Sequence, residues 1–514
     1  MSLVGLDVGT TGCKAIVVDL GGRIIAQSYR EYPLHSPRPG WHELDPGEVW
    51  AGIVAVLTEA AAQTGGEDPI RALAVTSQGE AGVALTADGD VLGRSLVSFD
   101  TRSAPQAERW IAEFGAQRTF EITGQPPQSM YTIPKLLWMK ENIPGFTERL
   151  WKFLCFEEFV IYRLTGELVT SYALASRTMA FDVTSKCWSS VILSAAGLSP
   201  DIFATPRPSC EVVGEIRPEL ADQLDWPRGV RVATAGHDQP CGAFGSGVIE
   251  PGAAVDGTGT VECITAAFAE PVLTETMLKH HFCCYPHVAR GLYVTLAFNF
   301  TGGSLLRWFR DVLGAADISE AARTGRDVYD IILDQATEGP VNLLTLPHFA
   351  VAGTPYMDEH ARGGMVGLSL STTRGGIIKS LIDGLTFEMR LNLEILDRAG
   401  VRIDTLRAIG GGAKSAKWLQ LKADIFGKPV CALDVTEAPC LGAAMAAGIA
   451  IGDYADEREA VAAAVHVQRV FEPDQTRHAQ YTERYRVYER LYPSLREIAH
   501  ELHALDAGAG GSAQ

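Results

Sequence analysis

A short hairpin pattern occurs twice in this chain, and it constrains the fold more than any other feature. Residues 1–22 read MSLVGLDVGTTGCKAIVVDLGG, in which an apolar run ends at Asp7, a Gly/Thr turn follows, and a second apolar run ends at Asp19. Residues 253–267 read AAVDGTGTVECITAA and again place a carboxylate, Asp256, before a Gly/Thr turn and an apolar run. Apolar runs on both sides of a glycine-rich turn are typical of a β-hairpin. Two such hairpins half a chain apart predict a duplicated, two-lobed architecture.

The turns of these hairpins also indicate a ligand. Residues 9–12 and 257–260 carry backbone N–H groups and hydroxyls that no bulky side chain covers. Such turns suit phosphate oxygens, and a carboxylate beside them suits a hydrated Mg²⁺. Two of these hairpins facing each other across a cleft would hold one nucleotide. The alternative is two ordinary glycine-rich hairpins, because short motif matches carry false positives.

Length and composition exclude several classes of protein. With 514 residues, the chain exceeds what one hydrophobic core usually holds, so two large domains are expected. No apolar segment of about 18 residues occurs and the chain begins with a strand pattern, so neither a membrane span nor a secretory signal is expected. Ten scattered cysteines without a CxxC pair indicate a reducing compartment, and we expect a cytoplasmic protein. A net charge of −18 without a basic stripe disfavours nucleic-acid binding.

Polar residues follow two of the predicted strands. The strand pattern Ile70–Ser77 runs directly into Gln78 and Glu80. Open α/β sheets bind ligands at the carboxyl ends of their strands, so we expect both side chains to contact a ligand. Asp100 and Arg102 follow another short strand, and they are either a pair that binds a hydroxylated substrate or a structural ion pair.

The sharpest chemical pattern is the segment 229–247, GVRVATAGHDQPCGAFGSG. A strand over residues 230–235 is followed by Asp238, and Pro240 suits the first turn of a helix. Asp238 would then lie at a helix N-terminus, where it is available as a general base for a hydroxyl. The alternative is that Asp238 caps the helix, and the two roles can coexist.

Three further segments have patterns that suggest a structure or a ligand. Residues 278–290 hold three histidines and two cysteines, but adjacent pairs in a strand point to opposite faces and the spacing is not a zinc pattern, so no metal site is expected. Residues 410–412 are three glycines before a predicted helix, a turn against which an adenine ring or phosphates would pack; a plain strand-to-helix turn is the alternative. Residues 205–215 are predicted to be an extended connector.

Taken in order, the motifs resemble those of the FGGY family of carbohydrate kinases, within the actin–hexokinase–Hsp70 fold superfamily. The resemblance runs from about Leu3 to Ser494 and rests on LDVGTTGCKAIVVD, GWHELDP, IPKLLWMK, RLTGELVTSY, GHDQPCGAFGSG, DGTGT, GGMVGLSL and GGGAKSAKWLQLKADIFGKPV. It implies an α/β fold of two actin-like (ribonuclease H-like) domains with a nucleotide cleft between them. The sugar-binding lobe would span 1–248, the nucleotide-binding lobe 249–494, and a terminal helix end with a flexible tail 495–514.

The resemblance also implies roles for individual residues, with ATP and Mg²⁺ as cofactors. Asp7 would help to position Mg²⁺, and Asp238 matches the catalytic base. The nucleotide contacts implied are Thr10, Thr11, Lys14, Gly257, Thr258, Gly303, Gly411, Gly412 and Ala413. Together with the strand-end pattern, the expected sugar contacts are Gln78, Gly79, Glu80, Asp100, Arg102, Asp238 and Gln239.

The substrate loop departs from two known patterns of this family. Xylulose kinases typically carry Met-His-Gly there, and glycerol kinases carry Gln-Arg-Glu. Here Gly79 stands in place of the arginine, which removes a bidentate clamp on hydroxyls. We expect a larger polyol, another ketose or a sugar acid to occupy the space left by Gly79, and the acidic Glu80 shifts the preference toward neutral sugars or polyols.

The resulting hypothesis is transfer of the ATP γ-phosphoryl group to a primary hydroxyl of a small ketose, such as a pentulose, or of a tetritol or pentitol. The expected partner is a small molecule, without nucleic acid or membrane, and a homodimer is left open. One alternative is a sensor that binds sugar and nucleotide without turnover, which would require a broken phosphate or base motif. The other is an Hsp70- or actin-like ATPase, which would require a peptide-binding module or a filament surface.

Overall fold

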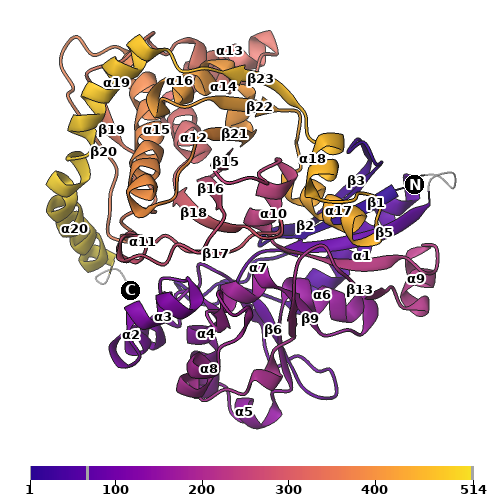
Figure 1. Ribbon diagram of the computed structural model, residues 1–514. Helices are drawn as coiled ribbons and strands as arrows, with labels where there is room; N and C mark the ends of the chain where they lie inside the picture. The colour runs from indigo at the N-terminus through magenta and orange to yellow at the C-terminus, as the bar shows by residue number, and fades with distance from the viewer. Residues whose placement is uncertain (1, 65–68, 511–514) are drawn as a thin grey trace.

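Two mixed β-sheets, one in each half of the chain, organise the computed structural model, which describes residues 2–64 and 69–510 (Figure 1). The N-terminal sheet has the strand order β13-β14-β5-β1-β2-β3. Its strands are β1 (Ser2–Val8), β2 (Gly12–Val18), β3 (Ile24–Glu31), β5 (Ile70–Ser77), β13 (Val212–Glu215) and β14 (Arg231–His237).

The C-terminal sheet repeats the central part of this topology. Its order is β17-β18-β16-β15-β21-β22-β23. In the first sheet the β1–β2 hairpin is followed by β5 and β14, both parallel to β1; in the second, the β15–β16 hairpin is followed by the parallel strands β21 and β22. The strands are β15 (Ala253–Thr258), β16 (Glu262–Phe268), β17 (Tyr285–Pro286), β18 (Tyr293–Asn299), β21 (Thr405–Gly410), β22 (Val430–Leu433) and β23 (Val467–Phe471). The predicted duplication and α/β fold are confirmed.

Two small-residue helices, α10 (Asp238–Gly245) and α17 (Ala438–Ile451), pack between the sheets (Figure 1). Their backbones touch: a Cβ on Gly442 would lie 2.1 Å from the Cys241 carbonyl oxygen, and a Cβ on Gly245 would lie 2.0 Å from that of Ala438. Helix α17 belongs to the second half of the chain, yet it packs on β1 and β5 of the first sheet. The small side chains of α17 allow this close approach of the two backbones.

The outer faces of both sheets are covered by amphipathic helices. On the N-terminal sheet these are α1 (Pro46–Ala62), α6 (Phe156–Thr165) and α9 (Pro218–Leu224). The C-terminal core is built with α12 (Gly303–Leu313), α14 (Val328–Asp334), α15 (Arg374–Ala399), α16 (Ala416–Phe426), α19 (Gln475–Tyr488) and α20 (Leu491–Gly510). The remaining helices of eight or more residues are α2 (Ala104–Glu113), α3 (Ala116–Thr123), α4 (Thr132–Asn142), α13 (Ala315–Thr324) and α18 (Glu457–Ala464).

Three expectations about local structure need correction. The segment 205–215 is extended as predicted, but it is more than a connector: β12 (Thr205–Arg207) pairs with β9 (Val169–Ser171), and β13 is the edge strand beside β14. The segment 278–290 is not a strand throughout: α11 (Glu275–Lys279) ends within it, His281 has a positive φ of 61°, and β17 begins at Tyr285. The tail is helical as far as Gly510, and residues 511–514 lie outside the described part.

The sequence predicts neither a metal-binding cluster in its His/Cys segment nor a membrane-spanning helix in its apolar runs. Among residues 2–64 and 69–510, no cluster of three or more His, Cys, Asp or Glu side chains has the geometry of a metal site. No helix in the same ranges is long and apolar enough to cross a membrane.

Candidate active site

Strands β1 and β2 present one carboxylate and one lysine beside the turn that joins them. Asp7 stands opposite Lys14 in the antiparallel register. Burial raises the pKa of Asp7 to about 8; the charge of Asp238 adds to the rise, Lys14 opposes it, and Glu437 adds a smaller increase. The Lys14 ammonium lies 2.8 Å from Glu437 Oε2, just before α17 begins. Acidic groups therefore gather around Asp7.

The same turn is braced by Gln78. Thr10 Oγ1 donates a hydrogen bond of 2.9 Å to Gln78 Oε1, and Gln78 Nε2 donates one of 3.1 Å to the Gly9 carbonyl oxygen. Thr11 is exposed at the tip of the turn. Because both ends of the Gln78 amide are engaged, this side chain shapes the predicted phosphate-binding turn instead of presenting a free amide to a sugar.

Glu80 forms a buried ion pair with Arg177. The Arg177 guanidinium contacts Glu80 Oε1, and Ser98 Oγ donates a hydrogen bond of 2.7 Å to Glu80 Oε2. Arg177 belongs to a short 3₁₀ turn, η1 (Ser176–Thr178), and its guanidinium lies 5.0 Å and 5.5 Å from the ring centroids of Tyr131 and Tyr285. The pair supplies hydrogen-bonding groups to the site without adding net charge.

Gly79 has no free space beside it. A Cβ at this position would lie 3.0 Å from His237 Nε2 and 3.1 Å from Arg177 Nε. The expectation that Gly79 leaves room for a larger substrate is therefore wrong, because these two side chains fill that room. A guanidinium does stand beside the loop, but it comes from Arg177 and not from the loop itself.

Asp238 lies at the predicted strand-to-helix junction. Strand β14 ends at His237, and Asp238 is the first residue of α10. Burial raises the pKa of Asp238 to about 7; Glu80 adds to the rise, while Gln239 and Arg177 oppose it. A carboxyl group with this pKa is matched to proton transfer near neutral pH.

Asp7 and Asp238 meet at one edge of the N-terminal sheet. Strands β1 and β14 both run parallel to β5, which lies between them, so their carboxyl ends share that edge. Asp7 Oδ1 is buried and has no hydrogen-bond partner among the described residues. Mg²⁺ is usually held by one or two carboxylates together with water and phosphate oxygens. A free carboxylate oxygen beside a second acid fits such an ion.

Asp100 and Arg102 form a buried ion pair, and their contact with a substrate stays a prediction. Arg102 Nε lies 2.9 Å from Asp100 Oδ1, and a second guanidinium nitrogen lies 2.9 Å from Glu43 Oε2. The guanidinium also lies 4.0 Å from the ring centroid of Trp41.

A buried lysine, Lys135, interacts with both Glu80 and Asp100. Burial lowers the pKa of Lys135 to about 8, and the charges of Glu80 and Asp100 oppose this change.

Six of the residues expected to bind the nucleotide come together in the C-terminal lobe, whereas Thr10, Thr11 and Lys14 belong to the first hairpin. The Gly303 N–H donates a hydrogen bond of 2.8 Å to the Gly259 carbonyl oxygen, which ties the start of α12 to the second hairpin turn. A Cβ on Gly412 would lie 2.7 Å from Thr258 Cβ, so the 3₁₀ turn η3 (Gly411–Lys414) packs against the same hairpin. Gly257 precedes Thr258 in β15, and Ala413 lies in η3.

A buried lysine supports this second hairpin. Lys422 Nζ lies 2.7 Å from Asp256 Oδ2, 2.6 Å from Thr258 Oγ1 and 2.6 Å from Glu262 Oε1. All four side chains are at most 2% exposed. Burial raises the pKa of Glu262 to about 7, and Lys422 is the largest opposing influence. The network fixes the Thr258 hydroxyl at the base of the turn.

Sequence reasoning missed four residues of this site: Arg177, Tyr285, Lys422 and Glu437. None follows a strand end or belongs to a glycine-rich turn, so none carries a local pattern that indicates chemistry. They reach the site through contacts between distant parts of the chain.

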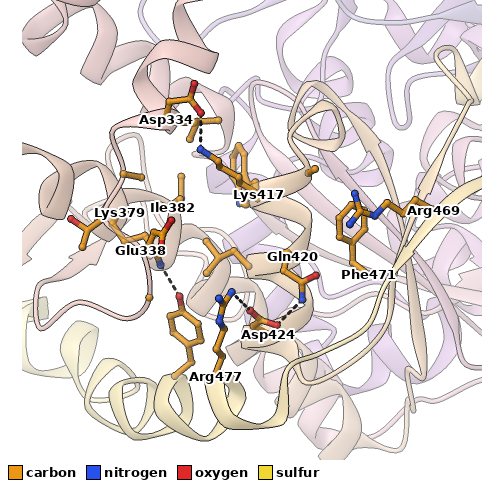
Figure 2. A pocket seen from close by; sticks show the side chains of 18 residues that line it. Asp334, Glu338, Lys379, Ile382, Lys417, Gln420, Asp424, Arg469, Phe471 and Arg477 are labelled. Carbon is orange, nitrogen blue, oxygen red and sulfur yellow. Dashed lines mark hydrogen bonds and ion pairs between the residues drawn. The ribbon is translucent and has the colours of Figure 1, made fainter.

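A separate cavity of about 410 Å³ lies in the C-terminal lobe, among α14, α15, α16, α19 and β23 (Figure 2). Two ion pairs lie in its wall: Lys417 Nζ lies 2.6 Å from Asp334 Oδ1, and Arg477 lies 3.6 Å from Asp424. None of the predicted site residues lines it. We assign this cavity no part in the reaction.

Comparison with known proteins follows the same division into two halves. Models of the FGGY family of carbohydrate kinases match as its N-terminal domain over residues 2–245 and its C-terminal domain over residues 254–451. The xylulose kinase of Bacillus subtilis is 28% identical over 497 residues, which cover 96% of this chain and 97% of that protein. The glycerol kinase of Thermococcus kodakarensis is 30% identical over 510 residues, 96% of each chain.

Solved structures agree. The crystal structure of xylulose kinase from Rhodospirillum rubrum is similar with a TM-score of 0.87 and 28% identity, over 97% of this chain and all of that one (100%). Both family models match in order and together span most of the chain. The chain therefore belongs to the FGGY family of carbohydrate kinases and is a phosphotransferase with the actin-like ATPase fold.

Proposed function

We propose that this kinase transfers the γ-phosphoryl group of ATP to a primary hydroxyl of a small neutral sugar or polyol, with Asp238 as the base. The observation that carries the proposal is the position and acidity of Asp238. It lies at the carboxyl end of β14, and burial raises its pKa to about 7. With this pKa, a large fraction of the enzyme carries an ionised Asp238 at neutral pH, and the carboxylate is still basic enough to accept the hydroxyl proton.

The remaining groups would bind and neutralise the phosphates. Asp7 would hold Mg²⁺, which when bound offsets charge on the transferred phosphoryl group. The turn over residues 9–12 and the second hairpin at Thr258 offer backbone N–H groups and hydroxyls from the two lobes. The glycine turn at residues 411–413 would receive the adenosine.

The charge balance near Asp238 favours a neutral acceptor. Glu80 and Arg177 neutralise each other, so their polar atoms can recognise hydroxyl groups but offer no net attraction to a carboxylate or phosphate. Xylulose and glycerol, after which the two relatives above are named, are both neutral compounds. We therefore place pentuloses, tetritols and pentitols ahead of sugar acids.

A coupled ADP-release assay with Mg²⁺ and ATP tests this proposal over a panel of ketoses, aldoses, polyols and sugar acids. Asp238→Asn serves as the blank and Asp222→Asn, at an exposed ion pair, as the matched control. We expect one neutral compound to react about 10²–10⁴-fold faster with wild type than with Asp238→Asn, and the control to match wild type. Retention of a tenth of the rate by Asp238→Asn refutes the role of Asp238. ATP binding without acceleration by any compound favours a sensor.

A further inference from the structure

A contact between the two lobes, from Tyr285 to His237, extends to the proposed catalytic base Asp238. Tyr285 lies in β17 of the C-terminal sheet, and His237 ends β14 of the N-terminal sheet. The Tyr285 hydroxyl lies 2.8 Å from His237 Nδ1, and His237 Nε2 lies 3.2 Å from Asp238 Oδ1. The side chains of Tyr285 and His237 are buried. These contacts thus connect Tyr285 of the C-terminal lobe, through His237, to the proposed catalytic base Asp238 of the N-terminal lobe.

The imidazole in this chain is neutral. Burial, with a contribution from Arg177, holds the pKa of His237 well below its ordinary value. A neutral imidazole donates from one ring nitrogen and accepts at the other. A lone pair on Nε2 would face the Asp238 carboxylate and repel it, whereas a proton on Nε2 attracts it. Nδ1 is then the acceptor, and the Tyr285 hydroxyl is the donor it needs.

The approach of Nε2 to Asp238 is not yet aligned as a hydrogen bond, since Oδ1 has no partner of good geometry among the described residues. Catalytic contacts are often loose in this way before substrate binds. The neighbouring glycine shows that the imidazole is tightly placed, because a Cβ on Gly79 would lie 3.0 Å from Nε2. A small rotation of the Asp238 carboxylate is therefore the simplest way to complete the bond.

We propose that Tyr285 and His237 are positioning residues for the base: Tyr285 fixes the proton of His237 on Nε2, and Nε2–H orients the Asp238 carboxylate toward the acceptor hydroxyl. This inference rests on the proposed role of Asp238 and extends it to the second lobe. The orientation of the base then depends on where the C-terminal sheet holds Tyr285.

The arrangement has a defined effect on the pH dependence. A donor at Nε2 stabilises the ionised form of Asp238, so its loss raises the pKa of Asp238 and moves the acid limb of the rate profile to higher pH. The other charged or titratable groups that face Asp238 or His237 are Asp7, Glu80, Arg177, Cys263 and Tyr285, and the uncharged Gln239 also donates hydrogen bonds to Asp238.

Tyr285→Phe removes the donor to Nδ1, and Tyr293→Phe is its matched control. Tyr293 lies on the adjacent strand β18, and its buried hydroxyl also crosses between the lobes, to the Val183 carbonyl oxygen at 3.3 Å. We expect Tyr285→Phe to lower kcat about tenfold, to leave KM for ATP within twofold and to shift the acid limb upward. Tyr293→Phe is expected to match wild type in all three. Equal behaviour of the two variants overturns the proposal.

Two further variants separate positioning from packing. His237→Gln keeps a side-chain N–H donor, and His237→Leu removes it at similar size. We expect His237→Gln to retain much more activity than His237→Leu, with a difference of about tenfold or more in kcat. Equal losses in both variants would mean that His237 acts through packing alone.

A spectroscopic readout keeps the test independent of turnover. In ¹⁵N-histidine NMR spectra, with the His237 resonances assigned by their loss in His237→Gln, we expect wild type to show a protonated Nε2 and an unprotonated Nδ1. A protonated Nδ1 in wild type overturns the proposal even if Tyr285→Phe does not fold. If no compound is phosphorylated, the proposed function fails, while the tautomer still decides whether Tyr285 fixes His237.

Discussion

Replacing Arg177 by methionine measures how much the site depends on one buried ion pair. The side chains of Arg177 and Glu80 are 4% and 2% exposed. Without the guanidinium, the Glu80 carboxylate keeps the Ser98 hydroxyl but loses its counter-charge. Removing one partner of a buried pair costs about 3–5 kcal/mol of stability. In a domain of this size that corresponds to a fall in melting temperature of roughly 6 to 20 °C.

The sign of the pH dependence provides a second check on Arg177→Met. An uncompensated buried carboxyl has its pKa raised in the folded state, so it binds a proton that the unfolded chain has lost at neutral pH. The free energy of unfolding of this variant should therefore fall as pH rises from about 5 to 7, relative to wild type. Urea unfolding followed by tryptophan fluorescence at several pH values measures it.

The double variant Glu80→Gln/Arg177→Met distinguishes a buried charge from lost packing. Replacing both members of a buried ion pair by neutral residues of similar size is often close to neutral for stability. We expect the double variant to regain most of the lost stability but not the kinase activity, because the guanidinium beside Asp238 is still missing. Arg228→Met, at an exposed pair with Asp222, is the control and should show no measurable change. A double variant no more stable than Arg177→Met would refute the reasoning.

Three other predictions follow from the site. Because burial raises the pKa of Asp238 to about 7 and the base must be ionised, kcat/KM for the sugar should increase with pH through about 7; a flat profile from pH 5 to 8 contradicts this. Gly79→Ala places a Cβ 3.0 Å from His237 Nε2, so kcat should fall about tenfold while circular dichroism spectra stay unchanged. Full activity of this variant would show that the space beside Gly79 is free. Lys422→Met leaves two buried carboxylates without their cation and should cost about 3–5 kcal/mol in urea unfolding, whereas Lys417→Met, 69% exposed on the same helix, should match wild type; similar losses in both would contradict the role of the network.

The parts of the fold that the sequence predicted are those with local patterns. The hairpin at Asp7, the hairpin at Asp256 and the junction at Asp238 each combine an apolar run with a turn, and each forms as expected. Asp7 and Asp238 could be expected to meet because parallel strands end at the same edge of a sheet. The segment 278–290 was harder, because its apolar residues pack against other parts of the chain without a regular strand period.

The contacts that no local pattern indicates are those made across the chain. Tyr285 and His237 come from different lobes, and Lys422 reaches the second hairpin from a helix far along the sequence. Gln78 shows the same limit in reverse: its place after a strand indicated a ligand contact, but only the fold shows that its amide is engaged by the neighbouring turn. Side-chain partners of this kind are set by tertiary packing and not by the period of the sequence.

Gly79 shows why a missing motif residue is weak evidence about substrate size. From the loop alone, the absent arginine implied an empty volume. The structure fills that volume with Arg177, held by Glu80 and flanked by Tyr131 and Tyr285. A guanidinium fixed by an ion pair and two rings loses little further freedom when it binds a hydroxyl, so it can recognise a sugar as well as one carried on the loop. Selectivity in this kinase is therefore to be sought in the groups that surround Arg177 rather than in the size of the residue at position 79.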